Sequence, residues 1–131
     1  MRYMLLIYGD ESRWDDIPEE EQAAQMERWG EYSKALVDAG AFVAGEGLQT
    51  SSTATTLRVE NDEVILTDGP FAETKEQVGG FYVIDVENLD QAIEWAKKLP
   101  STGNGMPTDV RPVMAYEEAG LEHPHREGAA S

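Results

Sequence analysis

Apolar residues along the chain change their spacing several times, and each change predicts a new element. Residues 2–8 form an apolar and aromatic run that Gly9 ends, which is typical of a buried strand. Between Pro18 and Gly40 the spacing becomes helical, with acidic residues in the first turn. The predicted buried stripe of this helix consists of Met26, Trp29, Ser33, Leu36 and Val37.

The middle of the chain predicts strands rather than helices. Residues 41–48 read as a strand interrupted at Gly45-Glu46-Gly47, where we expect a bulge or a close approach to the backbone. Residues 55–59 and 63–67 read as a hairpin, because Asn61-Asp62 tolerate the positive φ of a two-residue turn. A polar loop is then predicted up to Gly79-Gly80, followed by a strand over residues 81–86.

A second helix carries clear boundary signals. Asn88 is suited to cap it with Gln91 three residues later, and Pro100 is expected to stop it. Its predicted stripe consists of Leu89, Ala92, Ile93, Ala96 and Leu99. A last strand is predicted over residues 110–116, so that the domain spans residues 1–116 and residues 117–131 form a flexible tail of acidic and small residues.

The order of elements predicts an α+β fold. Two β-α-β units with an inserted hairpin suggest an antiparallel sheet with two helices on one face, the ferredoxin-like split β-α-β arrangement. The sheet then carries apolar residues on a face that no helix covers. Pairing two such sheets across a two-fold axis buries them, so we predict a homodimer.

Composition narrows the classes of partner. The chain has 131 residues and no cysteine, and its 26 acidic and 10 basic side chains give a net charge of −16. Such a charge disfavours nucleic acid and anionic membranes, because both are bound through clustered Lys and Arg. The five-residue apolar run near the start is too short for a signal peptide or a membrane span, and the absence of cysteine suits the cytoplasm.

Several segments resemble the DGPF branch of the YCII-related family over residues 2–116. The most specific is the ten-residue block around Asp68, in which Asp68-Gly69-Pro70-Phe71 is followed by Ala72-Glu73-Thr74-Lys75-Glu76. Shorter similarities lie at Ala44-Gly45-Glu46-Gly47-Leu48, Gly79-Gly80-Phe81-Tyr82 and Val110-Arg111-Pro112-Val113-Met114.

The resemblance implies a dimeric α/β-barrel architecture, a largely undefined biochemical role, and an association of DGPF members with extracytoplasmic-function sigma factors. Some relatives in the wider family are proposed enzymes with a His and an Asp facing each other in a cleft. This chain departs from that pattern, since its histidines, His123 and His125, both lie in the predicted tail. Whether it is an enzyme therefore stays open.

Candidate site residues cluster around the Asp68 motif. Asp68, Lys75 and Glu76 are the catalytic candidates, because carboxylates or lysine would have to perform any acid-base chemistry. The ligand-binding candidates are Arg58, Glu46, Phe71, Glu73 and Arg111. A purely structural role for Asp68 is also open, since a carboxylate before Gly-Pro commonly accepts hydrogen bonds from turn N–H groups. No metal site and no cofactor are predicted.

Two functional hypotheses follow. In the first, the homodimer binds an unknown polar small molecule in a cleft around the motif, with or without catalysis. In the second, the chain is a protein-interaction module that assists transcription regulation, its acidic surface meeting a basic partner.

Overall fold

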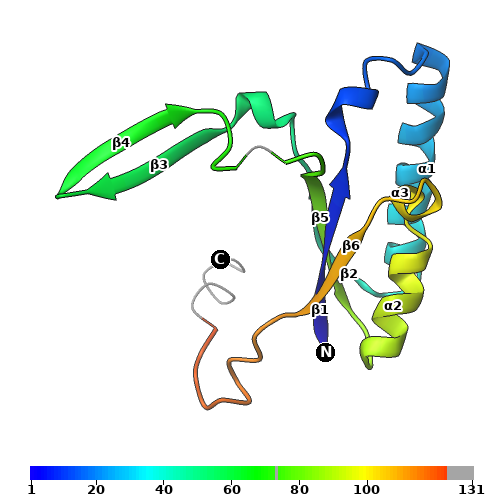
Figure 1. Ribbon diagram of the computed structural model, residues 1–131. Coiled ribbons are helices and arrows are strands. Elements are labelled where there is room, and N and C mark those ends of the chain that lie inside the picture. Colours follow the sequence, from blue (N-terminus) through cyan, green and yellow to red (C-terminus); the bar gives the residue numbers. More distant parts are fainter. Residues whose placement is uncertain (73, 124–131) are drawn as a thin grey trace.

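The computed structural model describes residues 1–72 and 74–123. Four antiparallel strands form the main sheet in the order β2-β5-β1-β6 (Figure 1). The strands are β1 (Arg2–Gly9), β2 (Phe42–Gly47), β5 (Gln77–Asp85) and β6 (Thr108–Pro112). This mixed α+β arrangement is consistent with the ferredoxin-like fold that the sequence predicts.

The helices cover one face of that sheet (Figure 1). They are α1 (Glu19–Asp38), α2 (Leu89–Lys97) and the short α3 (Pro100–Gly103), with 3-10 turns at η1 (Glu11–Arg13) and η2 (Ser51–Thr53). Alternate residues of β1 point into the core beneath the helices. The core comprises Tyr3, Leu5, Ile7, Tyr32, Leu36, Ala41, Tyr82, Ile84, Val86, Ala92, Ala96 and Leu99.

Helix α1 forms where the spacing predicts it, but its buried stripe is narrower than expected. Leu36 is fully buried, whereas Met26 and Val37 are 62% and 58% exposed, so their predicted burial is wrong. Tyr32 is buried instead, and its hydroxyl donates to the Trp95 carbonyl at 2.8 Å. A narrow face of the helix is therefore buried, and the Tyr32 ring contacts the Trp95 ring of α2 with centroids 5.9 Å apart.

Helix α2 begins as predicted. The Asn88 side chain accepts from the Gln91 N–H at 3.0 Å, and Gln91 in turn accepts from the Glu87 N–H at 2.9 Å. Ala92 and Ala96 are buried, while Leu89 and Ile93 at the edges of the stripe are exposed. Pro100 does not end the helical region outright, because it occupies the first turn of α3, where its missing N–H is not needed.

Three details of the strands differ from the sequence prediction: the position of one irregularity and the limits of two strands. The irregularity in β2 falls between Phe42 and Ala44, not at the glycines. Gly79-Gly80 lie inside β5, so the polar loop is shorter than expected. Strand β6 ends at Pro112, and one further backbone hydrogen bond joins the Val113 N–H to the Arg2 carbonyl of β1 at 2.9 Å.

The close approach expected at the β2 glycines is present and comes from within the chain. A Cβ on Gly45 would lie 2.7 Å from Cδ1 of Tyr82, and one on Gly80 would lie 2.8 Å from the Glu46 carbonyl oxygen. These glycines allow β2 and β5 to meet with the Tyr82 ring over the β2 backbone.

A separate two-stranded hairpin projects from the domain on the side opposite the helices (Figure 1). It consists of β3 (Thr55–Glu60) and β4 (Glu63–Asp68), paired from Thr55↔Asp68 to Glu60↔Glu63. Asn61 and Asp62 have φ of 50° and 64°, as the predicted two-residue turn requires. The predicted hairpin is therefore confirmed.

The second face of the main sheet carries apolar residues, and no helix covers it within the described residues (Figure 1). Strand pairing places Met4 beside Val83 and Leu6 beside Phe81 on this face. All four are partly exposed. We call these four residues the open sheet face.

The segment after β6 includes a turn in which the Leu121 N–H donates to the Tyr116 carbonyl at 2.8 Å. The predicted tail extends beyond the described residues, which end at residue 123. Among the helices of the described chain, none combines the length and the hydropathy needed to cross a bilayer.

Candidate functional site

The Asp68 motif lies at the base of the hairpin, where β4 ends. Backbone and hydroxyl contacts fix the turn: the Gly69 N–H donates to the Ala54 carbonyl at 2.7 Å, and the Thr56 hydroxyl donates to the Gly69 carbonyl at 2.8 Å. Gly69 has φ of +95°, a conformation that favours glycine. The Asp68 side chain is exposed and accepts no hydrogen bond within the described residues, so it does not cap this turn.

Arg58 and Phe71 form the best-defined contact of the motif. The guanidinium carbon of Arg58 lies 4.7 Å from the centre of the Phe71 ring, a cation-π arrangement. Phe71 is 74% exposed, so the stacked pair lies open to solvent. The guanidinium N–H groups make no hydrogen bond or ion pair within the part of the chain that the structure describes. They are free to bind an external acceptor.

The structure separates the catalytic candidate Asp68 from the ligand-binding candidate Arg58 within one chain. Asp68 pairs with Thr55, whereas Arg58 pairs with Ile65, so strand alternation places the two side chains on opposite faces of the hairpin. Lys75 and Glu76 are exposed in the connection to β5. Glu73 lies outside the described residues.

Lys75 lies near the 3-10 turn η1. The Ser12 hydroxyl and N–H, both bound to the Asp10 carboxylate, lower the pKa of Asp10, and the charges of Arg13 and Lys75 lower it further. Lys75 therefore has an acidic neighbour in this part of the chain, although no ion pair joins them.

Glu46 and Arg111 lie around the open sheet face. Glu46 pairs with Phe81 on β5, and Arg111 pairs with Met4 on β1, so both follow the alternation of that face. They occupy the two edge strands β2 and β6, separated by β5 and β1. At about 4.8 Å per strand, three spacings set the backbones of these two edge strands about 14 Å apart.

Two polar contacts near this region were not found from the sequence. The Tyr8 hydroxyl donates to the Asp109 carboxylate at 2.9 Å, and this hydrogen bond raises the pKa of Tyr8. The Glu11 carboxylate accepts from the Ser51 N–H at 2.8 Å and from its hydroxyl at 2.7 Å, which joins η1 to η2 near the hairpin base. Neither pair is close in sequence, so only strand register and loop packing reveal them.

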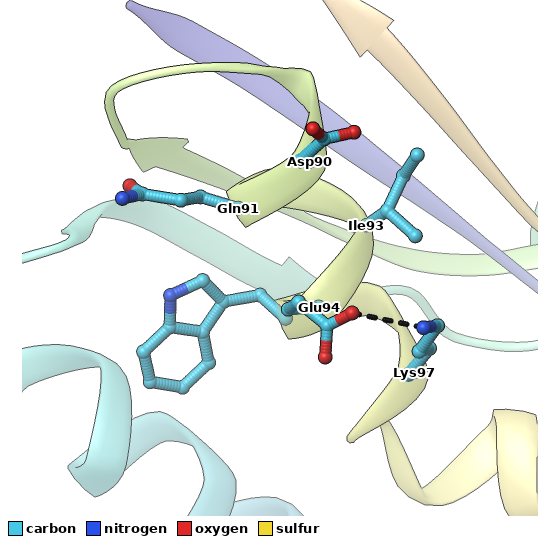
Figure 2. Close-up of a pocket in the computed structure, with 6 residues that line it drawn as sticks. Asp90, Gln91, Ile93, Glu94 and Lys97 are labelled. Carbon is cyan, nitrogen blue, oxygen red and sulfur yellow. Dashed lines mark hydrogen bonds and ion pairs between the residues drawn. The ribbon is translucent and has the colours of Figure 1, made fainter.

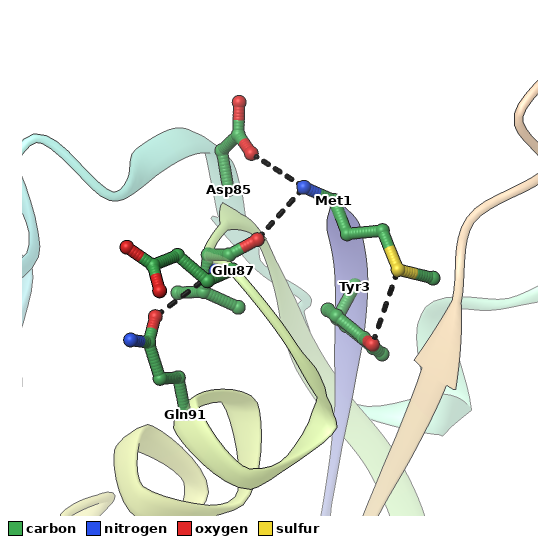
Figure 3. A network of polar contacts seen from close by, with 6 residues as sticks. Met1, Tyr3, Asp85, Glu87 and Gln91 are labelled. Carbon is green, nitrogen blue, oxygen red and sulfur yellow. Dashed lines mark hydrogen bonds and ion pairs between the residues drawn. The ribbon is translucent and has the colours of Figure 1, made fainter.

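Two surface hollows of the described chain lie away from the motif. One runs along α2, where the Lys97 ammonium nitrogen forms an ion pair with a Glu94 carboxylate oxygen at 2.8 Å (Figure 2). The other lies at the opposite end of β1, where the Met1 ammonium binds Asp85 at 3.2 Å and the Val86 carbonyl at 2.7 Å (Figure 3). No predicted site residue lines either hollow.

Metal ligands are not clustered in the described residues. No group of three or more His, Asp or Glu side chains there has the geometry to hold an ion. His123 contacts the Tyr116 ring with centroids 5.1 Å apart, and His125 lies outside the described residues.

The split β-α-β sheet with helices on one face defines a small protein of ferredoxin-like type. Comparison with family models matches the YCII-related domain to residues 1–116. The chain therefore belongs to the YCII-related family. It is also 39% identical over 125 residues to an uncharacterised protein of Rhizobium meliloti (strain 1021), a match that covers 92% of this chain and 98% of that protein.

Proposed function

We propose that the chain is a homodimeric, DGPF-type member of the YCII-related family that binds a small molecule carrying an acidic group at the Arg58–Phe71 pair. One observation carries the proposal. Arg58 is held by stacking on an aromatic ring, and its N–H donors make no ion pair with the carboxylates of the described residues. A guanidinium in this state offers a planar fork that matches a carboxylate or phosphate.

The net negative charge of the chain restricts where an anionic ligand can bind, which favours the Arg58–Phe71 pair over most of the surface. A net charge of −16 repels anions from the surface in general. An anion is therefore attracted where a cation makes no ion pair, and Arg58 makes none within the described residues, although Glu60 and Glu63 share its face of the hairpin. Lys75 follows the same motif and supplies a second positive charge for a ligand of sufficient size.

The open sheet face supports the dimer. Met4, Leu6, Phe81 and Val83 leave apolar surface exposed on the central strands. A second copy related by a two-fold axis covers this surface with an equivalent one and gives the dimeric α/β-barrel arrangement.

Catalysis is a separate hypothesis. Asp68 lies on the face of the hairpin opposite Arg58, so a proton transfer by Asp68 to a ligand at Arg58 requires the Asp68 of a second copy. Lys75 and Glu76 lie in the connection to β5. We retain the three as candidates for that role.

The binding proposal is tested with inorganic phosphate and succinate as probes. Backbone amide NMR shifts of wild type should move at Arg58 and Phe71 on titration, and Arg58→Gln should remove the response. Arg28→Gln is the matched control, because Arg28 lies on α1 and is paired with Glu21 at 3.1 Å. An equal response in Arg58→Gln, or no response of wild type to either anion, would end the proposal.

The acidic surface favours a second candidate, a protein-interaction module in transcription regulation. Glu19, Glu20 and Glu21 are exposed together at the start of α1. A basic protein partner would be held there by charge, so its complex should weaken steeply with added salt. A pull-down at low salt that recovers no partner would count against this candidate.

A further inference from the structure

The β3–β4 hairpin has one apolar and one polar face. Leu57 pairs with Leu66 and Val59 pairs with Val64, which places these four side chains on the same face. They are 60%, 64%, 61% and 62% exposed, respectively. The opposite face carries Thr56, Arg58, Glu60, Glu63, Ile65 and Thr67. We call the four-residue surface the apolar face of the arm.

Within the described residues, the hairpin contacts the rest of its chain near its base, through Arg58 with Phe71 and Thr56 with Gly69, while its apolar face stays exposed. It forms a sheet of its own, and no ladder joins it to the four-stranded sheet. A two-stranded hairpin is marginally stable in water unless its apolar face is covered. Contiguous exposed apolar surface of this kind marks a contact with another molecule.

We propose that the hairpin is an arm that lies against a second copy of this chain, with its apolar face buried in the contact. This inference rests on the homodimer of the proposed function and adds the element that reaches the partner. The arm leaves the domain on the side of the open sheet face, opposite the helices (Figure 1).

If two open sheet faces pack together, the length of the arm brings it into contact with the second copy. Each of its strands has 6 residues, which at 3.4 Å per residue spans about 20 Å. Sheets that pack face to face lie only about 10 Å apart. An arm that projects from one sheet toward its partner therefore extends past the partner's sheet and lies along it.

Two-fold symmetry and charge favour a second copy over an unrelated protein. Each copy has both an open sheet face and an arm. In a two-fold symmetric dimer, the same contact forms twice and covers these two surfaces in each copy. The central rows of the apolar face contain no charged residue, and Glu60 and Glu63 at the tip belong to the opposite face. The acidic chains can thus meet over these four side chains without a carboxylate among them, while Asp68 lies on the same side at the base of the arm.

The proposed contact of the arm also places the Asp68 motif at the boundary between the two copies. Asp68 lies on the apolar side, at the base of the arm, whereas Arg58 and Phe71 lie on the other side. Burying the apolar face brings Asp68 to the edge of the interface, beside groups of the second copy. The Asp68 motif then belongs to both chains.

The test compares two neighbouring substitutions that add the same charge to opposite faces of the arm. Leu66→Asp should weaken dimerisation by about 100-fold in sedimentation equilibrium, as loss of a central apolar contact does. Thr67→Asp, on the polar face, should weaken it by less than about 3-fold. Leu66→Thr keeps the strand preference and should give an intermediate loss of about 10-fold.

Hydrogen exchange supplies a second measurement that does not depend on any variant. Amides of β3 and β4 should be protected in concentrated wild type and lose that protection on dilution, together with dimer dissociation. The amides of β1 and β5 should stay protected throughout.

The outcomes separate the two proposals. A wild type that is dimeric and unaffected by Leu66→Asp overturns the arm and leaves the dimer standing. A wild type that is monomeric at micromolar concentration overturns both the dimer and the arm, while anion binding at Arg58 is judged by its own titration. Equal losses for Leu66→Asp and Thr67→Asp overturn the assignment of the apolar face.

Discussion

The ring of Tyr82 lies directly on the backbone of Gly45, where a Cβ would come within 2.7 Å of Cδ1 and 2.9 Å of Cε1. Tyr82 cannot move aside easily, because its ring packs on Tyr32 with centroids 5.3 Å apart and its hydroxyl is hydrogen-bonded to Ser33. Gly45→Ala should therefore cost about 1 to 3 kcal/mol of unfolding free energy by overpacking.

Gly47 provides the control for that prediction. It lies on the same strand, and a Cβ there would meet nothing within 4 Å. Gly47→Ala should leave the melting temperature unchanged or raise it slightly, because it restricts the unfolded chain. Thermal unfolding followed by circular dichroism measures both, and equal stability of the two variants would contradict the Tyr82 contact.

The turn at the motif is held by Thr56 rather than by Asp68. The Thr56 hydroxyl donates to the Gly69 carbonyl at 2.8 Å, whereas the Asp68 carboxylate accepts no hydrogen bond within the described chain. Thr56→Val should cost about 0.5 to 1.5 kcal/mol. Asp68→Asn should leave the melting temperature within about one degree of wild type.

The Asp68→Asn result separates the two roles left open by the sequence. An unchanged melting temperature means that the carboxylate is not needed for the fold, and attention then turns to ligands and to the second copy. A fall of several degrees in Asp68→Asn, at equal dimerisation, would restore the structural role.

Stability should fall in alkali because of Tyr32. Burial raises the pKa of Tyr32 above its ordinary value of 10.0. The folded state then holds a proton that the unfolded state releases above about pH 10, so stability is complete below that pH and is lost as pH rises toward the folded pKa. The expected slope is about 1.4 kcal/mol per pH unit.

Tyr32→Phe tests this dependence. The variant loses the hydrogen bond to the Trp95 carbonyl and should be less stable at neutral pH by about 1 kcal/mol. Its stability should decline less steeply than that of wild type above pH 10, as measured by urea unfolding at several pH values. An identical alkaline slope in both proteins would show that Tyr32 does not ionise on unfolding in this range.

Local signals in the sequence determined most of the elements. The Asn88 cap, the Asn61-Asp62 turn and the apolar run of β1 each depend on residues within a few positions of one another, and the structure confirms all three. The order of those elements also predicted the ferredoxin-like arrangement, because short connections leave few ways to arrange two β-α-β units. Membership of the YCII-related family followed from the motif segments.

Only the tertiary structure decided which side chains are buried and which of them lie on the same face. The helical spacing of α1 does not say how wide its buried face is. The spacing predicts Met26 and Val37 in the core, whereas in the structure both are exposed and Tyr32 is buried. Proximity in sequence likewise suggested that Asp68 and Arg58 share a pocket, but strand alternation sends them to opposite faces of the hairpin. Register, side-chain direction and packing depend on contacts between distant segments, and local preferences do not fix them.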